Sequence, residues 1–339
     1  MTTVRPTPAE TKQHIPGIDL PVSRIALGCM SIVASETYGG VGPEQAIDTV
    51  RTAIDEGITL LDTAPAYGNG ESEELVGRAI EGKRDKVVLA TKASGPTLSG
   101  KEIAEDCETS LKRLKTDYID LYQVHWNRRV VPAEETVRAL EKLLDEGKVR
   151  AIGVCNYGPK DLQEIFSLTD KIRTNQMAYS MLVRAIEFEI VDLCIKHNVG
   201  ILCYSPLAQG LLTGRYRSAD EVPVGRQRTR HFSCDRELAR HGQPGCEKET
   251  FEAIAQVRAI CEEIGQPMGR VALAWCLHQP GVTSVLAGAS RPDQVRENVR
   301  AAELTLSEDV LEKLDRATAT VKEILGADPD VWAAESRIR

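Results

Sequence analysis

The chain has 339 residues, of which 42% are hydrophobic and 27% charged, and its formal net charge is -8. This composition is typical of a globular protein, and the acidic balance argues against nucleic-acid binding, which usually needs a basic excess. No apolar stretch reaches the ~18 residues of a transmembrane helix, and residues 1–13 contain no apolar signal-peptide core. The nine cysteines lack framework spacing, so we expect reduced, mostly buried thiols in a cytoplasmic protein.

Short apolar strands alternate with helices along most of the chain. A loose leader at residues 1–10 and a short hairpin around Pro16-Gly17 come first, and a loop is predicted at 29–42. We predict strands at residues 25–28, 58–61, 87–91, 118–124, 149–154, 172–176, 200–204 and 283–287. We predict helices at residues 43–56, 72–80, 101–114, 132–146, 159–167, 186–197, 250–264, 268–279, 292–302 and 307–320.

Eight strands that alternate with helices predict an α/β protein of the (β/α)8 TIM-barrel class. Parallel strands need helical crossovers, and eight such units close into a barrel. An open doubly wound sheet is the competing fold, but its first turn would carry a G-x-G-x-x-G pattern that residues 28–31 lack. We expect one domain over residues 1–339, with a barrel core at about 25–302, an irregular loop after strand seven at 206–248 and a C-terminal helix and tail at 303–339.

Polar side chains stand at the ends of three consecutive predicted strands. Asp62 and Tyr67 follow the second strand, Lys92 follows the third and His125 follows the fourth. Chemistry in a barrel gathers where strands end, and a buried acid there needs a partner such as Lys92. Taken singly, Asp62 could cap a loop, Lys92 could be solvated and His125 could be a core histidine. Taken together, they indicate a catalytic site.

These strand-end residues, in this order, resemble the aldo-keto reductase superfamily. The resemblance covers about residues 25–300 and is closest to the bacterial branch with a long loop after strand seven. It rests on six segments: Leu61-Asp62-Thr63-Ala64 with Tyr67-Gly68, Thr91-Lys92, Tyr118-Ile119-Asp120-Leu121 with His125-Trp126, Gly153-Val154-Cys155-Asn156, Tyr204-Ser205-Pro206-Leu207, and Gly288-Ala289-Ser290-Arg291. The resemblance implies an NADP(H)-dependent oxidoreductase, without a metal, that acts on a small aldehyde, ketone or sugar.

The family's catalytic tetrad falls on Asp62, Tyr67, Lys92 and His125. A carbonyl that accepts a hydride becomes an alkoxide and needs a proton, which a tyrosine of pKa about 10 gives reluctantly. A nearby ammonium lowers the pKa of a tyrosine, and a buried carboxylate keeps that ammonium charged. Tyr67 is therefore expected to be the general acid or base, Lys92 to tune it and Asp62 to anchor Lys92. His125 is expected to hydrogen-bond the substrate oxygen.

The resemblance also implies where the cofactor binds. Tyr204 would stack on the nicotinamide, whose carboxamide Asn156 and Gln176 would hold, with Cys155 in place of the family's usual serine. Four residues would lie along the pyrophosphate: Ser205, Leu207, Gln209 and Gly210.

The adenosine end of the cofactor is expected at the start of the last barrel helix. The residues concerned are Gly288, Ser290, Arg291, Gln294 and Asn298. A helix N-terminus with a guanidinium beside it can bind phosphate. The resemblance implies that Ser290 and Arg291 take the 2′-phosphate and that Gln294 and Asn298 face the adenine. This favours NADP(H) and leaves NAD(H) open.

The substrate pocket is predicted at four residues, Met30, Ile32, Trp126 and Asn127, beside the 206–248 loop. The polar pair Asn127 and Arg128 favours a hydroxylated or sugar-like substrate over a steroid. The expected partner is thus a small carbonyl or sugar, with no nucleic acid or membrane, and the protein would be a monomer or homo-oligomer.

Several alternatives remain open at this point. The enzyme could oxidise a sugar lactol or hydroxyl, or the chain could be a non-catalytic nucleotide-sensing barrel like those attached to some potassium channels. A metal-dependent hydrolase would need clustered histidines at strand ends, where only His125 stands. The loop holds zinc-type side chains at His231, Cys234, His241 and Cys246, in a spacing typical of no zinc module, and several arginines that suit phosphates or the acidic body. The polar tail could fold over the site or be disordered.

Overall fold

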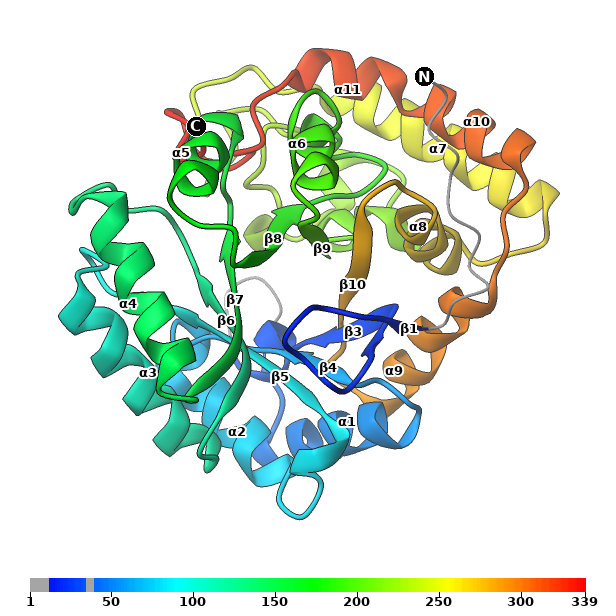
Figure 1. Ribbon diagram of the computed structural model, residues 1–339. Coiled ribbons are helices and arrows are strands. Elements are labelled where there is room, and N and C mark those ends of the chain that lie inside the picture. Colours follow the sequence, from blue (N-terminus) through cyan, green and yellow to red (C-terminus); the bar gives the residue numbers. More distant parts are fainter. Residues whose placement is uncertain (1–11, 35–39) are drawn as a thin grey trace.

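The computed structural model describes residues 12–34 and 40–339, so the predicted leader and part of the predicted 29–42 loop lie outside the described residues. Eight parallel strands close into a barrel in the order β10-β3-β4-β5-β6-β7-β8-β9 (Figure 1). The strands are β3 (Ile25–Gly28), β4 (Leu60–Asp62), β5 (Val88–Ala93), β6 (Ile119–Val124), β7 (Val149–Cys155), β8 (Ile172–Ala178), β9 (Gly200–Tyr204) and β10 (Val282–Gly288). The predicted (β/α)8 barrel is confirmed.

Helices surround this barrel on the outside (Figure 1). Eight of them follow the successive strands: α1 (Pro43–Asp55), α2 (Glu71–Ala79), α3 (Gly100–Leu114), α4 (Ala133–Asp145), α5 (Pro159–Leu168), α6 (Ile190–Lys196), α8 (Met268–Leu277) and α9 (Pro292–Val299). Three more, α7 (Glu247–Glu263), α10 (Glu308–Ala317) and α11 (Ala319–Leu325), pack together on one side. None of the helices in the described part of the chain has the length and apolar character needed to cross a membrane.

Local sequence explains why these helices form where they do. In α3, the Ser99 hydroxyl accepts a hydrogen bond from the backbone N–H of Glu102, which caps the first turn. Buried apolar side chains then follow at helical spacing, at Ile103, Cys107 and Leu111, and face the barrel.

Three predicted elements differ from the structure. The predicted helix at 186–197 begins only at Ile190, after a short 3-10 turn at Ala185–Glu187, because Glu189 has a non-helical φ of -145°. The ladder between β5 and β6 continues through Lys92, which pairs with Gln123, so Lys92 lies inside β5 and not after it. The predicted helix at 307–320 is two helices, because the chain breaks at Thr318. Its hydroxyl donates to the backbone oxygen of Leu314 and accepts from Arg184, contacts that compete with a continuous helix.

A short hairpin closes the N-terminal end of the barrel, as the Pro16-Gly17 turn predicts. Its strands β1 (Lys12–Gln13) and β2 (Val22–Ser23) pair antiparallel and flank the turn. Ile15, Ile18 and Val22 are buried against the inward-facing apolar residues of the barrel strands. Gly17 has φ +93°, and a Cβ there would lie 2.6 Å from the backbone oxygen of Arg150, so this close approach requires glycine.

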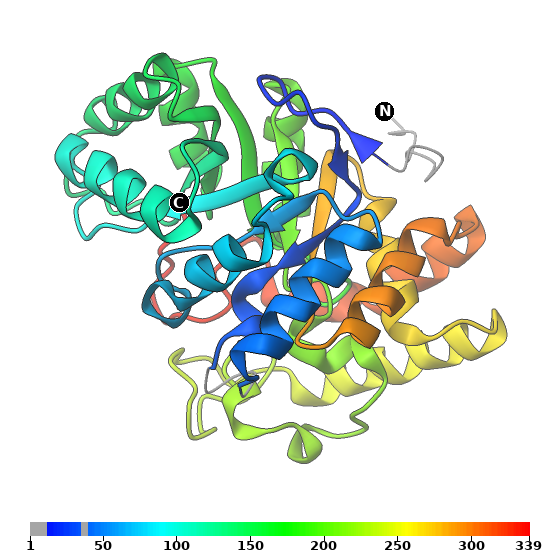
Figure 2. The same cartoon turned by 90° about the horizontal axis from the view of Figure 1, so that it is seen from below.

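The irregular segment between β9 and α7 lies at the opposite end of the barrel (Figure 2). Helix α7 begins at Glu247, so the predicted loop ends slightly earlier than expected. Ion pairs fix this loop: Arg236 contacts Asp220 within the loop and Glu247 at the start of α7, and Arg230 contacts Asp328 in the C-terminal tail.

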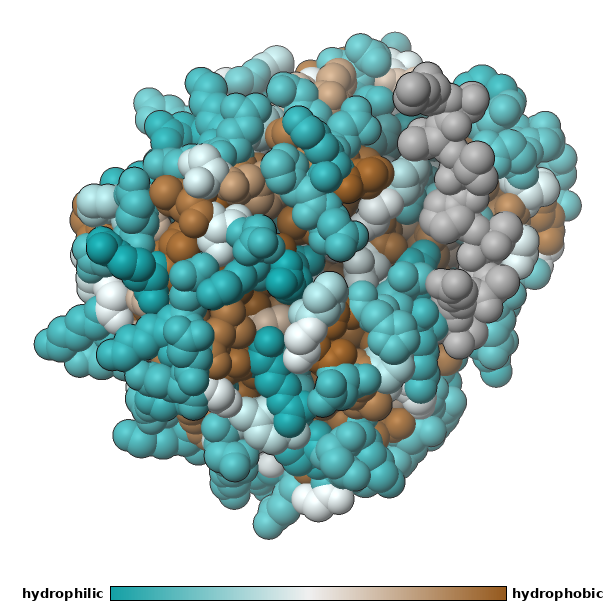
Figure 3. Space-filling view, viewed as in Figure 1, coloured by the Kyte–Doolittle hydropathy of each residue, from teal (hydrophilic) through white to brown (hydrophobic). Residues whose placement is uncertain are grey.

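The C-terminal tail is ordered and folds over the same end. Arg337 forms a two-pronged ion pair with Asp330, whose carboxylate is fully buried, and the backbone oxygen of Arg339 accepts from Asp161 N–H. The opposite end of the barrel, around the hairpin, presents a mostly hydrophilic surface, with apolar residues scattered between charged ones (Figure 3).

Candidate active site

A cavity of about 530 Å³ opens at the C-terminal ends of the strands. Its walls come from strand ends or following loops of β3, β4, β6, β7, β8, β9 and β10, and from the C-terminal tail. Three of the predicted catalytic residues, Asp62, Tyr67 and His125, line this cavity, and the fully buried Lys92 contacts two of them. The predicted tetrad is therefore brought together in one place.

Lys92 is the centre of this cluster. Its Nζ lies 3.0 and 2.9 Å from the two Asp62 carboxylate oxygens, 2.8 Å from the backbone oxygen of Thr63 and 3.3 Å from the Tyr67 hydroxyl. Asp62 lies at the end of β4, beside β5, so the barrel brings the two side chains together. A buried ammonium is stable only when its donors are used, and here every contact is a charge-assisted hydrogen bond.

The electrostatics of the pair differ in part from the sequence-based expectation. Burial disfavours the charged form of Lys92, but Asp62 and Tyr67 outweigh that effect and raise the pKa of Lys92, so its ammonium persists. Burial raises the pKa of Tyr67 to about 12, and the neighbouring Lys92 opposes this only in part. The predicted lowering by Lys92 exists, but desolvation exceeds it. Tyr67 is therefore fully protonated at neutral pH.

His125 lies directly after β6 at the cavity wall. Its Nδ1 is 3.0 Å from the Ser94 hydroxyl, and its ring meets the Tyr67 ring edge-on at a centroid distance of 6.0 Å. Burial lowers the pKa of His125 to about 3, helped by the charges of Lys92 and Arg128. The imidazole is thus neutral, and its remaining nitrogen, Nε2, is the ring atom left for a ligand.

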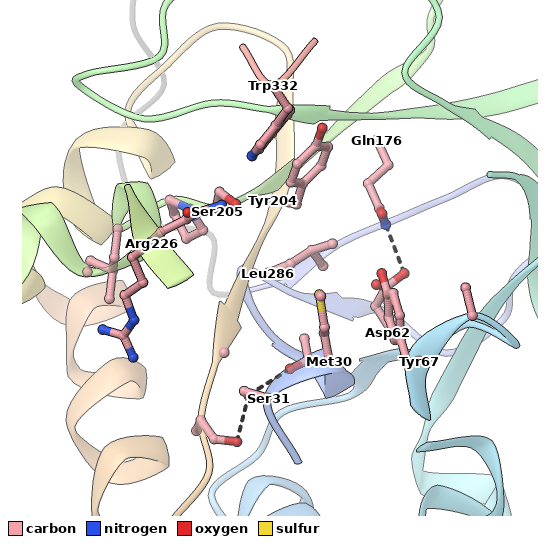
Figure 4. Close-up of a pocket in the computed structure, with 18 of the residues that line it drawn as sticks. Met30, Ser31, Asp62, Tyr67, Gln176, Tyr204, Ser205, Arg226, Leu286 and Trp332 are labelled. Carbon is pink, nitrogen blue, oxygen red and sulfur yellow. Dashed lines mark hydrogen bonds between the residues drawn. The ribbon is translucent and has the colours of Figure 1, made fainter. Parts of the chain in front are cut away.

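Two amides predicted to hold the nicotinamide carboxamide already have protein partners. Gln176 donates to the Asp62 carboxylate at 2.8 Å, as Figure 4 shows. Asn156 donates to the backbone oxygen of His125 at 3.1 Å and accepts from the Tyr204 hydroxyl at 2.7 Å. These contacts tie the predicted cofactor residues to the tetrad.

The predicted pyrophosphate residues line the cavity on a strained stretch of backbone. Ser205, Ala208 and Gln209 have positive φ values of 52°, 46° and 55°, and Asn156 has 60°. Such conformations cost about 1 kcal/mol or more each and are frequent at ligand-binding sites. In addition, the side-chain oxygen of Gln209 is buried without a hydrogen-bond partner in the described part of the chain.

The predicted adenosine residues divide into two groups. Gly288, Ser290 and Gln294 line the cavity, and the Gln294 side chain accepts from the Ser290 backbone N–H at 2.8 Å. Arg291 is exposed and paired with Asp293 at 3.0 Å, outside the cavity wall, and Asn298 donates to the backbone oxygen of Gly288 at 3.4 Å.

The predicted substrate residues also divide. Met30 and Trp126 line the cavity, whereas Ile32 is fully buried in the core because its short helical turn packs inward. Asn127 turns away and donates to Asp161 at 3.2 Å, beside a second cavity of about 160 Å³. The expectation of a sugar-like substrate rested partly on Asn127, and that support is lost.

The family can now be identified. The family model described as "Aldo/keto reductase family" matches residues 24–319. The chain belongs to the aldo/keto reductase family. Aldo-keto reductase YhdN of Bacillus subtilis is 37% identical over 291 residues, which cover 81% of this chain and 84% of that protein. An NADH-specific methylglyoxal reductase of Escherichia coli is 34% identical over 313 residues, which cover 86% of this chain and 93% of that protein.

Other similar proteins extend this picture. A probable voltage-gated potassium channel subunit beta of Arabidopsis thaliana is 30% identical over 319 residues, covering 88% of this chain and 95% of that one. The crystal structure of an aldo/keto reductase from Klebsiella pneumoniae in complex with NADP and acetate has a TM-score of 0.73 at 30% identity. The match covers 91% of this chain and 95% of that one.

Sequence reasoning did not assign two residues of the tail to the cavity of this aldo/keto reductase. Trp332 stacks on Tyr204 at a centroid distance of 5.9 Å (Figure 4), and Arg337 lies 4.0 Å over the Trp126 ring. Arg226 and Arg228, two of the loop arginines that the sequence suggested for contacts with phosphates or the acidic body, also line the cavity. An isolated tryptophan in a polar tail was the one signal in the sequence that could have indicated Trp332.

The possible zinc residues of the long loop are not gathered around a common point. His231 is buried with its ring nitrogens against the Thr229 hydroxyl and the backbone oxygen of Leu182, and Cys234 is exposed. In residues 12–34 and 40–339, no three His, Cys, Asp or Glu side chains form a group that could hold a metal. All nine cysteines of this aldo/keto reductase are free thiols, and eight are buried.

Proposed function

We propose that this chain is an NADP(H)-dependent oxidoreductase that transfers hydride between the nicotinamide and the carbonyl or alcohol carbon of a small substrate. The observation that carries this proposal is the Tyr67 hydroxyl at the cavity, 3.3 Å from the Lys92 ammonium that Asp62 holds. A proton donor, a buried charge that stabilises its anion and a neutral histidine are the groups that carbonyl reduction requires.

The residues present fit a dinucleotide. Positive-φ backbone at residues 205–209 and the buried, unpartnered oxygen of Gln209 indicate a loop shaped for a ligand. Asn156, Gln176 and Tyr204 would hold the nicotinamide end, and Ser290 and Gln294, at the start of α9, the adenosine end. When bound, the cofactor supplies or receives the hydride.

The proton moves at the Tyr67 oxygen. When the substrate carbonyl oxygen becomes an alkoxide, Tyr67 donates its proton, and the ammonium of Lys92 stabilises the phenolate that remains. Asp62 and the Thr63 carbonyl keep Lys92 charged and in place. The high pKa of Tyr67, about 12, keeps the donor protonated at neutral pH and therefore favours reduction there, with oxidation favoured at alkaline pH.

The cavity favours a small, planar carbonyl compound as substrate. Met30, Trp126 and Trp332 present apolar and aromatic surface, while Tyr67 and His125 supply the polar groups for one carbonyl oxygen. One relative is named a methylglyoxal reductase, which supports a small reactive aldehyde or ketone. Sugar oxidation at the same site is the alternative direction.

The choice between NADP(H) and NAD(H) depends on the start of α9. Arg291 could exchange its exposed pairing with Asp293 for a 2′-phosphate, since exposed ion pairs contribute little. A structural neighbour binds NADP, which supports NADP(H), whereas one relative is NADH-specific.

Tryptophan fluorescence during separate titrations with NADPH and NADH tests the proposal. Trp126 and Trp332 line the cavity, so we expect strong quenching by NADPH at micromolar concentration, followed by NADPH oxidation with methylglyoxal or another small carbonyl. Binding without turnover on a broad carbonyl and alcohol panel would favour the second candidate, a nucleotide-sensing subunit, which the potassium-channel relative raises. Absence of any response in folded protein would refute both.

We also propose that the protein works in the reducing cytoplasm. Eight buried free thiols, among them Cys29 and Cys155 next to the catalytic cluster, suit a compartment in which disulfides do not form. Burial raises the pKa of both thiols, so they stay protonated and unreactive.

A further inference from the structure

Ser94 is a polar residue next to the catalytic cluster that the tetrad does not include. It follows β5 directly, two residues after Lys92, and its Oγ lies 3.0 Å from Nδ1 of His125. This distance is that of a hydrogen bond between a hydroxyl and a ring nitrogen.

Both partners of this contact are fixed by other parts of the fold. The backbone N–H groups of Ser94 and Gly95 donate to one carboxylate oxygen of Asp106, on α3, at 2.9 and 2.8 Å. The backbone N–H of His125 donates to the oxygen of Ala93 at 3.0 Å, and its carbonyl accepts from Asn156. The hydroxyl and the imidazole are therefore held face to face by contacts on both sides.

A neutral imidazole carries one N–H, and its partner decides which nitrogen bears it. If the Ser94 hydroxyl donates to Nδ1, the proton must sit on Nε2, where it can be donated to a carbonyl oxygen. If Nδ1 instead donates to Ser94, Nε2 offers a lone pair, which repels a carbonyl oxygen. Burial and the neighbouring cations keep His125 neutral, so the choice of tautomer decides what the ring offers the substrate.

We propose that Ser94 is a positioning residue that donates its hydroxyl hydrogen to Nδ1 of His125 and so holds the N–H on Nε2, facing the substrate oxygen. This inference rests on the proposed carbonyl reduction. Ser94 acts only through His125. The substrate oxygen then receives two donors, the Tyr67 hydroxyl and His125 Nε2, and the bond to Ser94 keeps the ring from turning when the substrate leaves.

Kinetics of three variants test the proposal. Ser94→Ala removes the hydroxyl, and we expect kcat/KM for carbonyl reduction to fall about tenfold, as for the loss of one hydrogen bond that orients a catalytic group. Ser94→Thr keeps a hydroxyl and should restore most of the activity. Thr97→Ala is the matched control, because Thr97 bonds Glu102 at 2.7 Å in the same loop and does not touch His125. It should retain wild-type kinetics.

NADPH binding and the melting temperature should be the same in Ser94→Ala and in Thr97→Ala. A Ser94→Ala enzyme with wild-type kcat/KM would overturn the proposal. So would an equal loss of activity in Thr97→Ala, because the effect would then come from the loop as a whole.

The tautomer can also be measured without any turnover. Nitrogen NMR of the full chain labelled with ¹⁵N-histidine can measure this, with the His125 signals assigned as those missing in His125→Asn. We expect Nε2 to be protonated and Nδ1 to be unprotonated and to accept a hydrogen bond. In Ser94→Ala the Nδ1 resonance should move to the position of a free ring nitrogen. A proton on Nδ1 in the wild type would overturn the proposal. Because this signal needs no substrate, an inactive wild type would refute the proposed function while the tautomer is still decided.

Discussion

The two ends of the barrel use the same strands but opposite kinds of side chain. Inward-facing positions recur every second residue along a strand. The apolar plug is the cluster of buried residues, among them Ile15, Ile18 and Val22, that fills the N-terminal end of the barrel. On β4, Leu60 belongs to this apolar plug, whereas Asp62 belongs to the polar cluster around Lys92. On β9, Leu202 lies in the plug and Tyr204 lines the cavity. On these strands, the residue that packs in the apolar plug and the residue that lines the cavity are therefore only two positions apart.

This comparison predicts which property of the protein a substitution at each end should change. The hairpin residues Ile15, Ile18 and Val22 fill the N-terminal end of the barrel interior with apolar surface. The C-terminal end buries Lys92 and Asp62, which is unfavourable unless every contact is made. Substitutions at the first end should change stability, and substitutions at the second should change activity.

The largest expected effect comes from Tyr67→Phe at the polar end. It removes only the proton donor, so we expect turnover to fall about 1000-fold, or about 4 kcal/mol, with NADPH binding and melting temperature unchanged. Steady-state kinetics and fluorescence titration measure this. Tyr118→Phe is a matched control, because the Tyr118 ring stacks between Arg84 and Arg150, away from the cavity. Retention of a tenth or more of the activity would rule out Tyr67 as the acid.

The reverse result is expected for Ile18→Ala at the plug. Ile18 is 5% exposed, and truncation of a buried isoleucine should lower the free energy of unfolding by about 2–4 kcal/mol. Activity per folded molecule should stay the same. Denaturant unfolding and kinetics below the transition test both, with the half-exposed Ile195→Ala as control. A loss of activity without a loss of stability would show that the two ends are coupled.

Acid should destabilise the polar end through His125. Its folded pKa of about 3 lies below the ordinary 6.5, so between these values the unfolded chain binds a proton that the folded chain does not. The free energy of unfolding should therefore fall by about 1–2 kcal/mol between pH 6.5 and pH 5, because the stability that neutral His125 contributes is lost as the pH falls. His125→Asn should flatten this part of the stability profile. Parallel profiles for wild type and His125→Asn would contradict the assignment.

The smallest expected effect is that of Arg291→Ala at the rim of the cavity. Loss of one exposed charge-assisted contact should weaken NADPH binding about fivefold and leave NADH binding unchanged. Fluorescence titration of both cofactors checks this, with Arg296→Ala on the same helix as control. Equal weakening of both cofactors would mean that the 2′-phosphate binds elsewhere.

Much of this molecule was predictable because its signals are local. Alternation of apolar strands with capped helices predicts the barrel, and polar residues at three strand ends predict the cluster of Asp62, Lys92 and His125, because parallel strands bring their ends to the same side. Family motifs add the cofactor residues Asn156, Gln176 and Tyr204, which line the cavity. Their roles in binding stay predictions.

Other features were decided only by contacts between segments far apart in the chain. The break at Thr318 depends on Arg184, the ordered tail depends on Asp161, and the orientation of Asn127 depends on that same carboxylate. The pKa of Tyr67 rises because tertiary packing removes water from it, an effect that exceeds the attraction of Lys92. Strand order and residue type are properties of the sequence itself, whereas desolvation and side-chain direction exist only once the chain has folded.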